Sequence, residues 1–272
     1  MITGKILIDG VDIKSTYGAY IVEEGYDDVP SLPAMKSPEK NDWFESNSVE
    51  IDLSSPCFES QKISFKMMMN GTTERAQSLI DFLMSKRTHD VEMVDIGRER
   101  ALRIVDVSAG GLSSIFNIRV NMYDDDPRGG IEYVAPSSFQ RNTGLTIDGI
   151  DVSKYGAVMT GSTDGLFPDV KMKDNKLVDS KHFDGELHST ESSVYVERDD
   201  IKVRLVVRSD SMTDFWEKRD ALLLDLTKPG ERIVSWKGKD AKAYYKNCNT
   251  INFFYFGRFW WEFELTFGCI GE

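Results

Sequence analysis

One short segment occurs twice in this chain, and the two copies lie about half the chain apart. Residues 8–13 read IDGVDI and residues 147–152 read IDGIDV. A Tyr-Gly-Ala tripeptide follows each copy, at 17–19 and at 155–157, with spacings that differ by one residue. This period is far longer than the repeats of solenoids and propellers. The pattern therefore predicts a tandem duplication of one domain.

The predicted division places the first domain at 1–130, a linker at 131–144 and the second domain at 145–272. A length of 272 residues allows each domain its own core. The apolar fraction of 40% is typical of a folded protein. Because no catalytic residue is repeated with the segment, the duplication favours an architectural role over a chemical one.

Both copies show the same order of predicted elements. Alternating polar and apolar residues predict half-buried strands, and apolar residues at helical spacing predict one helix per copy. In the first copy we expect strands at 5–13, 48–53, 61–69, 90–96, 99–107 and 114–122, a loop at 23–47, a helix at 72–86 and a turn at 110–111. In the second we expect strands at 145–152, 193–197, 201–207, 232–236, 242–247 and 259–267, a loop at 161–184 and a helix at 211–226. The two Asp-Gly pairs, at 9–10 and 148–149, predict tight turns.

These elements predict a mainly β (α+β) fold, with two tandem split β-barrels and one helix plugging each. A sheet this extensive must close on itself, form a sandwich or pair its edges with another chain.

The charge of the chain restricts its partners. The net charge of −12 argues against a protein that grips nucleic acid, since that requires basic patches. It is compatible with a surface past which DNA moves without sticking, and equally with a charge that only maintains solubility. No apolar run approaches the length of a membrane-spanning helix, and we expect neither a membrane span nor a secretory signal. The three cysteines predict reduced thiols, with a Cys248–Cys269 bridge left open.

We predict no catalytic residue, no cofactor and no metal site, and therefore no enzyme. Two histidines and two carboxylates do lie within seven residues, at His182, Asp184, Glu186 and His188. They are candidate metal ligands, but the first copy has no matching set. His89 lacks a nucleophilic partner in a recognisable motif. The acidic run 124–126 lacks the further ligands of a calcium loop and predicts an exposed turn.

The aromatic run at 251–261 is the most conspicuous local feature of the sequence. It carries apolar side chains on both faces of a predicted strand pair, and a monomer rarely exposes that much apolar area. We therefore predict that Phe254, Phe256, Trp260 and Trp261 contribute to an oligomer interface. The alternative is a hairpin buried on both faces within one domain.

The order strand, long loop, strands, helix and closing β-hairpin resembles the tail-tube fold of bacteriophage tails. The opening IDGVDI and Tyr-Gly, together with the aromatic closing strand FWWEFELTF at 259–267, resemble the distal tail proteins of siphophages. The resemblance covers both halves of the chain. It implies tube-like domains in a six-fold ring around the DNA channel, joining the tail tube to the host-recognition device.

The repeated second half departs from this family, whose second domain is usually a carbohydrate-module-like sandwich. Two tube-like copies in one chain resemble the baseplate hub proteins of contractile tails, in which three chains form a pseudo-six-fold ring. The resemblance implies a structural tail protein of a phage or prophage, found in the virion and made in the host bacterial cytoplasm. It implies self-association into a trimer or hexamer, other tail proteins as partners and DNA only as passing cargo. The loops at 23–47 and 161–184 are then arms toward adjacent rings, or simply solvated loops.

Two other classes stay open. A tandem β-sandwich that binds carbohydrate or a cell surface would stack sugar rings on exposed tryptophans, with Trp216, Trp236, Trp260 and Trp261 as candidates. An enzyme would require His182, Glu186 and His188 around a metal in one pocket.

Overall fold

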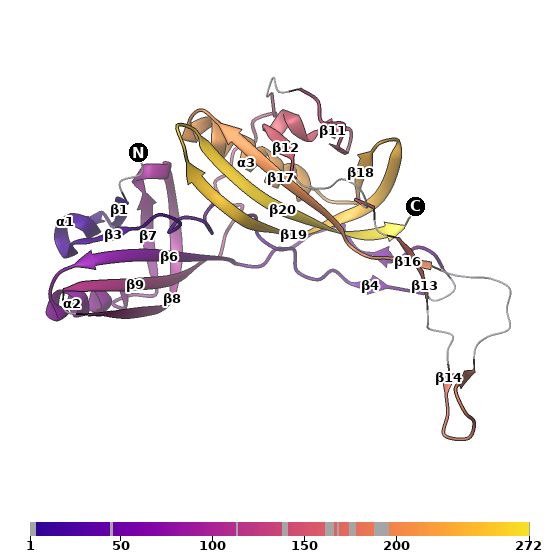
Figure 1. Ribbon diagram of the computed structural model, residues 1–272, viewed down its shortest axis with the longest axis horizontal. Helices are drawn as coiled ribbons and strands as arrows, with labels where there is room; N and C mark the ends of the chain where they lie inside the picture. The colour runs from indigo at the N-terminus through magenta and orange to yellow at the C-terminus, as the bar shows by residue number, and fades with distance from the viewer. Residues whose placement is uncertain are drawn as a thin grey trace.

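Two antiparallel seven-stranded sheets follow one another along the chain in the computed structural model (Figure 1). The structure describes residues 4–43, 46–112, 114–137, 141–160, 166–167, 169–173, 178–187 and 196–271. The fold is mainly β with a few helices, as the sequence predicts. The strand order is β2-β1-β7-β8-β9-β6-β3 in the first sheet and β11-β10-β18-β19-β20-β17-β12 in the second. When only the strands of each seven-stranded sheet are numbered in chain order, the two orders are the same.

The first half builds its sheet mainly from long central strands. Its elements are β1 (Ile6–Ile8), β2 (Val11–Asp12), α1 (Ile13–Tyr17), β3 (Ala19–Ile21), β4 (Lys40–Asn41), β5 (Glu50–Ile51), β6 (Gln61–Asn70), α2 (Thr73–Leu83), β7 (Thr88–Met93), the 3-10 helix η1 (Val94–Ile96), β8 (Arg98–Leu112) and β9 (Ile115–Asp124). Every second residue of β6 is buried, which is the alternation that predicted it. A hydrogen bond from Ile21 N–H to Gly4 C=O, at 3.0 Å, brings the β3 edge of this sheet to the start of β1.

The second half repeats this arrangement with longer closing strands. Its elements are β10 (Thr146–Ile147), β11 (Ile150–Asp151), the 3-10 helix η2 (Val152–Tyr155), β12 (Ala157–Met159), β13 (Val170–Met172), β14 (Val178–Asp179), β15 (Glu186–Leu187), β16 (Val196–Arg198), β17 (Ile201–Ser209), α3 (Met212–Leu226), β18 (Arg232–Trp236), β19 (Lys239–Tyr255) and β20 (Phe259–Gly271). Strands β13 to β16 form two small sheets of two strands each. Part of the predicted strand 193–197 lies outside the described residues.

Several predicted elements differ from the structure. The predicted opening strand at 5–13 is a hairpin, because Asp9 and Gly10 take positive φ values of 52° and 76° at the predicted tight turn. The predicted turn at Gly110 and Gly111 is wrong, since β8 continues through both glycines and pairs with β9. A Cβ on Gly111 would lie 2.1 Å from the Ile115 carbonyl oxygen, so glycine permits the close approach there. Short elements such as α1 went unpredicted, because five residues are too few to show a period.

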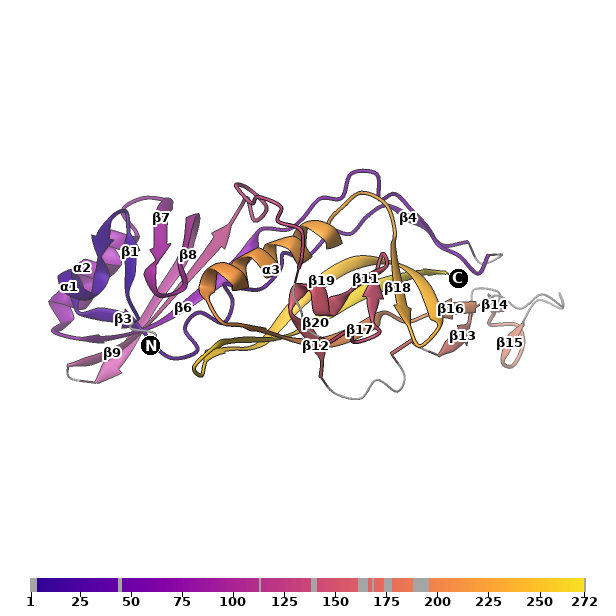
Figure 2. The same cartoon turned by 90° about the horizontal axis from the view of Figure 1, so that it is seen from above.

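Each long helix begins at a residue whose side-chain hydroxyl caps it. The Thr72 hydroxyl accepts a hydrogen bond from Arg75 N–H at the start of α2, and the Ser211 hydroxyl accepts one from Asp214 N–H at the start of α3. Figure 2 shows α3 running beside the second sheet, with its N-terminal end toward the first half. Among the described residues, no helix is long and apolar enough to cross a membrane.

Candidate interaction surface

Residues 30–43 and 46–59 form a strap that leaves the first sheet and runs along the second half (Figures 1 and 2). Met35 N–H donates to the Lys246 carbonyl at 2.7 Å, and Val49 N–H donates to the Ile270 carbonyl at 2.9 Å. The Tyr245 hydroxyl donates to the Pro33 carbonyl at 2.9 Å. Much of the predicted loop at 23–47 therefore packs on the chain's own second half, because its backbone groups find partners there. These parts of the loop are not free arms.

A buried arginine on α3 anchors the beginning of the strap. Arg219 is 2% exposed and donates to the carbonyl oxygens of Pro30 and Ser31, at 3.1 and 2.5 Å. It also donates to the Asp220 carboxylate at 2.8 Å. A buried guanidinium with all its partners in place fixes geometry, because each lost contact would leave a buried charge or carbonyl unpaired.

The first sheet contacts the same helix through the end of η1 and the start of β8. Arg98 forms a two-pronged ion pair with Asp220 at 2.9 and 3.1 Å. The Arg98 guanidinium lies 4.5 Å from the ring centre of Trp216, whose indole N–H donates to the Ile96 carbonyl at 2.5 Å. Burial lowers the pKa of Arg98, against the opposing effect of Asp220. These contacts and those of the strap form the junction between the two halves.

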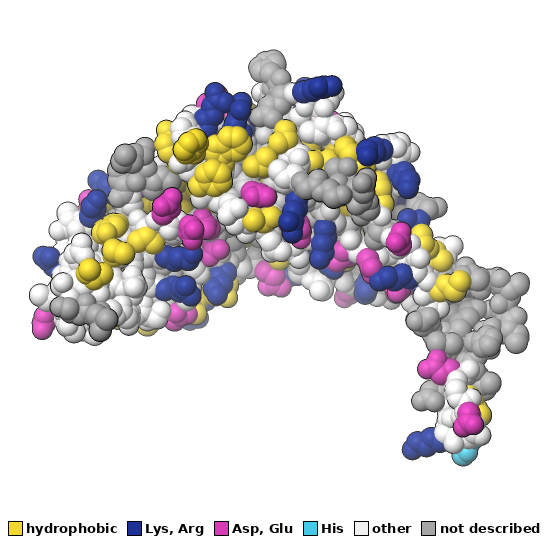
Figure 3. Space-filling view, in the orientation of Figure 1, with side chains coloured by type: hydrophobic (Ala, Val, Ile, Leu, Met, Phe, Trp, Pro, Cys, Tyr) yellow, Lys and Arg dark blue, Asp and Glu magenta, His cyan; other side chains and the backbone are white. Residues whose placement is uncertain are grey.

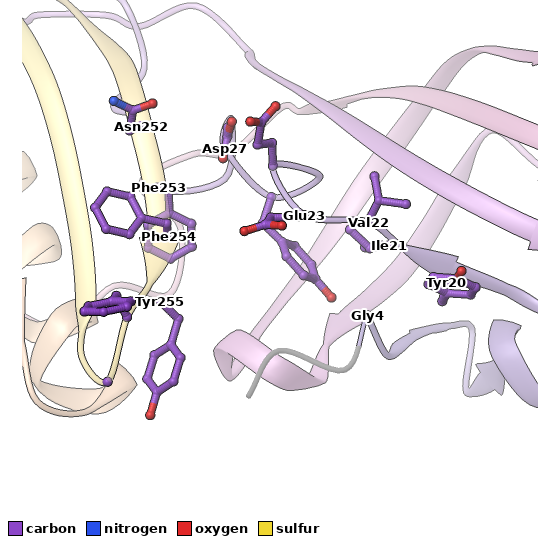
Figure 4. A pocket seen from close by; sticks show the side chains of 14 residues that line it. Gly4, Tyr20, Ile21, Val22, Glu23, Asp27, Asn252, Phe253, Phe254 and Tyr255 are labelled. Atoms are coloured by element: carbon purple, nitrogen blue, oxygen red, sulfur yellow. The ribbon is translucent and has the colours of Figure 1, made fainter.

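A cleft of about 790 Å³ opens beside the junction. One side comes from β3 and the turn after it, and the other from the tip of the β19–β20 hairpin (Figure 4). The residues that line it are Gly4, Tyr20, Ile21, Val22, Glu23, Glu24, Tyr26, Asp27, Asn252, Phe253, Phe254, Tyr255, Phe256 and Gly257. The cleft thus combines aromatic rings with three carboxylates, which suits a partner that is both apolar and basic.

Asp27 is the most perturbed carboxyl in this cleft. Burial raises its pKa from 3.8 to about 6, and the carboxylates of Glu24 and Asp28 add to the effect. Lys66 and a hydrogen bond from the Phe253 backbone oppose it. One Asp27 oxygen is buried without a hydrogen-bond partner. The hydrogen bond between Asp27 and the Phe253 backbone joins the two sides of the cleft.

Aromatic side chains gather on the surface over the tip of the β19–β20 hairpin (Figure 3). Phe254, Tyr255 and Phe256 are 42%, 40% and 83% exposed. The partly buried Trp260 stacks on Phe254, with ring centres 6.3 Å apart. We call Phe254, Phe256 and Trp260 the aromatic tip. They are three of the four residues predicted for an interface.

Trp261, the fourth predicted residue, lies on the opposite face of β20. It is fully buried and stacks on Phe263, and its indole N–H donates to the Thr250 hydroxyl at 3.0 Å. Its place in the predicted interface is therefore wrong. Successive residues of a strand face opposite sides, so Trp260 and Trp261 cannot both point at one partner.

The repeated Ile-Asp-Gly segment has a structural role. In the first half, the Asp9 carboxylate accepts a hydrogen bond from Asp90 N–H at 3.0 Å and lies 2.7 Å from Nδ1 of His89. The other ring nitrogen of His89 lies 2.8 Å from the Leu83 carbonyl at the end of α2. His89 is fully buried and joins the opening hairpin to the helix. Lys86 and His89 lower the pKa of Asp9 against the opposing effect of burial.

The second half builds the same corner with an arginine. The Asp148 carboxylate accepts hydrogen bonds from Ile233 N–H at 2.7 Å and from Arg232 at 2.8 Å. Arg232 also donates to four carbonyl oxygens at and after the end of α3, those of Asp225, Lys228, Pro229 and Gly230. The aspartate is thus repeated because it fastens the first hairpin to the sheet and to the helix end.

The acidic run 124–126 is not simply an exposed turn. Asp124 is 5% exposed and lies 3.6 Å from Arg100, and burial raises its pKa. Asp125 accepts two hydrogen bonds from Arg103, at 2.6 and 2.9 Å, which with Ser60 lower its pKa to about 2. These carboxylates are engaged within the fold.

The other candidate groups are not assembled into a site. His182, Asp184 and Glu186 are exposed, and His188 lies outside the described residues. No group of three or more metal-ligating side chains occurs in the part of the chain that the structure describes. All three cysteines are free thiols, and Cys248 is buried. Of the four tryptophans considered for sugar stacking, Trp216 and Trp261 are buried.

Sequence reasoning missed the junction entirely. Arg219 and Asp220 end a run of four charged residues in α3 that begins at Glu217, and such a run ordinarily predicts a solvated helix face, so the sequence carries no signal that this pair is buried. The partner Arg98 lies 122 residues away in the sequence, and no local pattern connects it with Asp220.

Comparison with known proteins adds little. No family model matches the chain, and no curated protein matches it. Two solved chains match. One is the SPP1 Dit protein, described as a paradigm of the hub adsorption apparatus in phages that infect Gram-positive bacteria. The alignment covers 97% of this chain and 98% of that chain, with 12% sequence identity and a TM-score of 0.34. A similarity this low carries no argument, so the proposal below depends on the chain's own residues and geometry.

Proposed function

We propose that this chain is a structural component of a phage or prophage tail, of the distal tail or baseplate hub type. It self-associates into a ring that joins the tail tube to the host-recognition device. The observation that carries the proposal is the pair of seven-stranded sheets with the same strand order, which follow one another in one chain and are joined at the junction. The two halves contact each other through two different faces, so each half leaves one of these faces unused. The unused faces are available for head-to-tail contacts with further copies of the chain.

The proposal includes the duplication and its boundaries, with domains at 1–130 and 145–272 and a linker at 131–144. It is supported by the corresponding strand orders and by the Asp9 and Asp148 corners. It is also supported by the shared N-cap positions of α2 and α3.

The aromatic tip is the proposed contact with a neighbouring tail protein or a second copy of the chain. Phe256 is 83% exposed, and Phe254 and Trp260 stack beside it. An exposed, stacked aromatic cluster is typical of protein interfaces. Carboxylates of the adjacent cleft favour a partner that carries basic side chains there.

DNA enters the proposal only as cargo. The net charge of −12 disfavours adhesion to phosphates, so a channel built from such chains lets DNA slide.

Light scattering and negative-stain microscopy of the purified chain test the proposal. We expect closed rings of three or six chains around a hole. A strict monomer, at high concentration and in the presence of a tail-tube preparation, would contradict it. Binding of cell-wall polysaccharide by such a monomer, with quenching of tryptophan fluorescence, would favour the carbohydrate-binding alternative.

The aromatic tip has its own test. Phe256→Asp places a charge in the proposed contact, and we expect it to weaken binding to the ring's partner by about tenfold or more. Met172→Asp is the matched control, because Met172 is 68% exposed but lies on β13, away from the tip. If the two substitutions weaken binding equally, the aromatic tip is not the contact with the partner.

A further inference from the structure

The contact between the halves provides a template for a contact between chains. At the junction, the end of η1 and the start of β8 meet the side of α3 that carries Trp216 and Asp220. Arg98 pairs with Asp220, and the Trp216 indole donates to the Ile96 carbonyl. If the halves are equivalent, each half owns a version of the helix surface and of the strand start, and the chain uses only one pair of them. The turn at 237–238 stands in the second half where η1 and Gly97 stand in the first, so the counterpart is the strand start without the 3-10 helix.

The first half carries the counterpart of the α3 surface on α2. Asp220 is the ninth residue after the N-cap Ser211, and Asp81 is the ninth residue after the N-cap Thr72. By the same count Gln77 stands at the position of Trp216, so a side-chain N–H donor is present at both. The Gln77 amide donates to Asp81 at 2.8 Å, and both residues are exposed.

The second half carries the counterpart of Arg98 at Lys239. In the first sheet, Ile8 pairs with Val91, and Met93, two residues further on, pairs with Arg98. In the second sheet, the equivalent Ile147 pairs with Val234, and Trp236, two residues further on, pairs with Lys239. A cation therefore begins the corresponding strand in both sheets.

Charge and exposure agree with this correspondence. Lys239 is exposed and pairs with no carboxylate in the described part of the chain. Arg98 is 16% and Asp220 is 10% exposed at the level of the side chain, because they already contact each other. The unused pair thus consists of one exposed carboxylate and one exposed ammonium on opposite halves.

We infer that a second copy of this chain docks head to tail. The β18–β19 turn of one copy contacts α2 of the next, and Lys239 pairs with Asp81 as Arg98 pairs with Asp220. The inference depends on the proposed self-association and names the surfaces that make it. A head-to-tail contact gives a ring when its rotation closes, in contrast to a two-fold dimer, in which both copies use the same patch.

The two contacts differ in strength. Ile80 occupies on α2 the position that Arg219 occupies on α3, one residue before the aspartate. The chain-to-chain contact therefore lacks the guanidinium that holds the strap. We expect it to be weaker than the junction, and assembly to depend on concentration and salt.

Charge reversal tests the pairing by sedimentation velocity across a concentration series. We expect Asp81→Lys alone and Lys239→Asp alone to weaken association by about tenfold or more, because each places like charges face to face. The combined variant restores the attraction and brings association back to within about threefold of the native chain. Glu217→Lys and Lys202→Glu are matched controls, because both residues are exposed and lie outside the proposed contact.

Mixing two cysteine variants makes the test more specific, because a head-to-tail contact needs one residue from each chain. A chain with Asp81→Cys and a chain with Lys239→Cys, both carrying Cys57→Ser, are treated together with a short bis-maleimide. We expect crosslinked pairs only in the mixture and not from either chain alone. Crosslinking within one variant alone would overturn the head-to-tail arrangement.

The outcomes separate the inference from the proposed function. If the native chain assembles, but charge reversal does not weaken association and the introduced cysteines do not crosslink, the inference fails and the tail proposal stands. If the native chain stays monomeric at every concentration, and also in the presence of a tail-tube preparation, both fail. Far-ultraviolet circular dichroism and urea unfolding confirm that each variant keeps its fold.

Discussion

The helices α2 and α3 follow equivalent strands and begin at equivalent caps, yet they are buried very differently. α2 buries Ala76, Leu79 and Leu83 along one face. The longer α3 buries nine of its fifteen residues, including Arg219 and Asp220. The reason is position: α3 lies between its own sheet and the junction, whereas the outer face of α2 meets solvent. The same element order thus produces a surface helix in one half and a central helix in the other.

The corners around the repeated aspartates show the same contrast. His89 closes the first corner with two contacts, to Asp9 and Leu83. Arg232 closes the second with bonds to Asp148 and to carbonyls at and after the end of α3. A guanidinium has more donors than an imidazole, so the second helix end is held by more bonds.

The largest expected effect is at Phe215. This residue is fully buried on α3 and lies 5.3 Å from Phe253 and 5.9 Å from Trp261, measured between ring centres. Phe215→Ala should lower the free energy of unfolding by about 4 kcal/mol, through lost burial and the cavity left behind. Urea unfolding measures it. Phe82→Ala on α2 is the control and should cost about half as much, because Phe82 is only partly buried. Equal losses would contradict the difference between the helices.

Arg219→Ala tests the strap. It removes donors from the Pro30 and Ser31 carbonyls and a partner from the Asp220 carboxylate, which all lie at the junction. We expect a loss of about 3 kcal/mol, since buried groups are left unpaired. Hydrogen exchange should rise at Met35 N–H, which bonds across to β19. Ile80→Ala at the equivalent position of α2 is the control, and protection at Met35 should then stay unchanged.

His89→Ala tests the weaker corner. The substitution removes one partner from the Asp9 carboxylate, which keeps Asp90 N–H, and one from the Leu83 carbonyl, and we expect a loss of about 2 kcal/mol in urea unfolding. Arg232→Ala is the companion variant and should cost more, because more acceptors lose a donor. The reverse order would show that the number of bonds does not decide the strength of the corner.

The smallest expected effect concerns the pH dependence at the cleft. Burial raises the pKa of Asp27 from 3.8 to about 6, so the folded chain binds more protons than the unfolded chain between these values. Stability therefore falls as pH rises through this window. Asp27→Asn should remove this slope and raise stability at pH 7 by about 1 kcal/mol, less than the full pKa difference because solvent reaches the group. Glu23→Gln, at an exposed position of the same cleft, should leave the slope intact.

Periodic segments were predictable, and short or long-range features were not. The alternation in β6, the strand β18 and the caps at Thr72 and Ser211 all carry local signals. The strand β3 has three residues, too few for a period. Phe256 and Trp261 were both predicted to lie in the interface, but Phe256 is exposed and Trp261 is buried. The difference depends on which face of the hairpin meets the core.

The sequence by itself determined the mainly β class, the two long helices and the tight Asp-Gly turns, because each depends on residues close together in the chain. Only the tertiary structure decided that the strap at 30–43 and 46–59 lies along the second half and that Arg98 pairs with Asp220. It also decided that His89 and Arg232 perform the same task. These contacts join residues as far apart in the chain as Val49 and Ile270, and their partners are selected by burial and hydrogen-bond satisfaction, which no local pattern encodes.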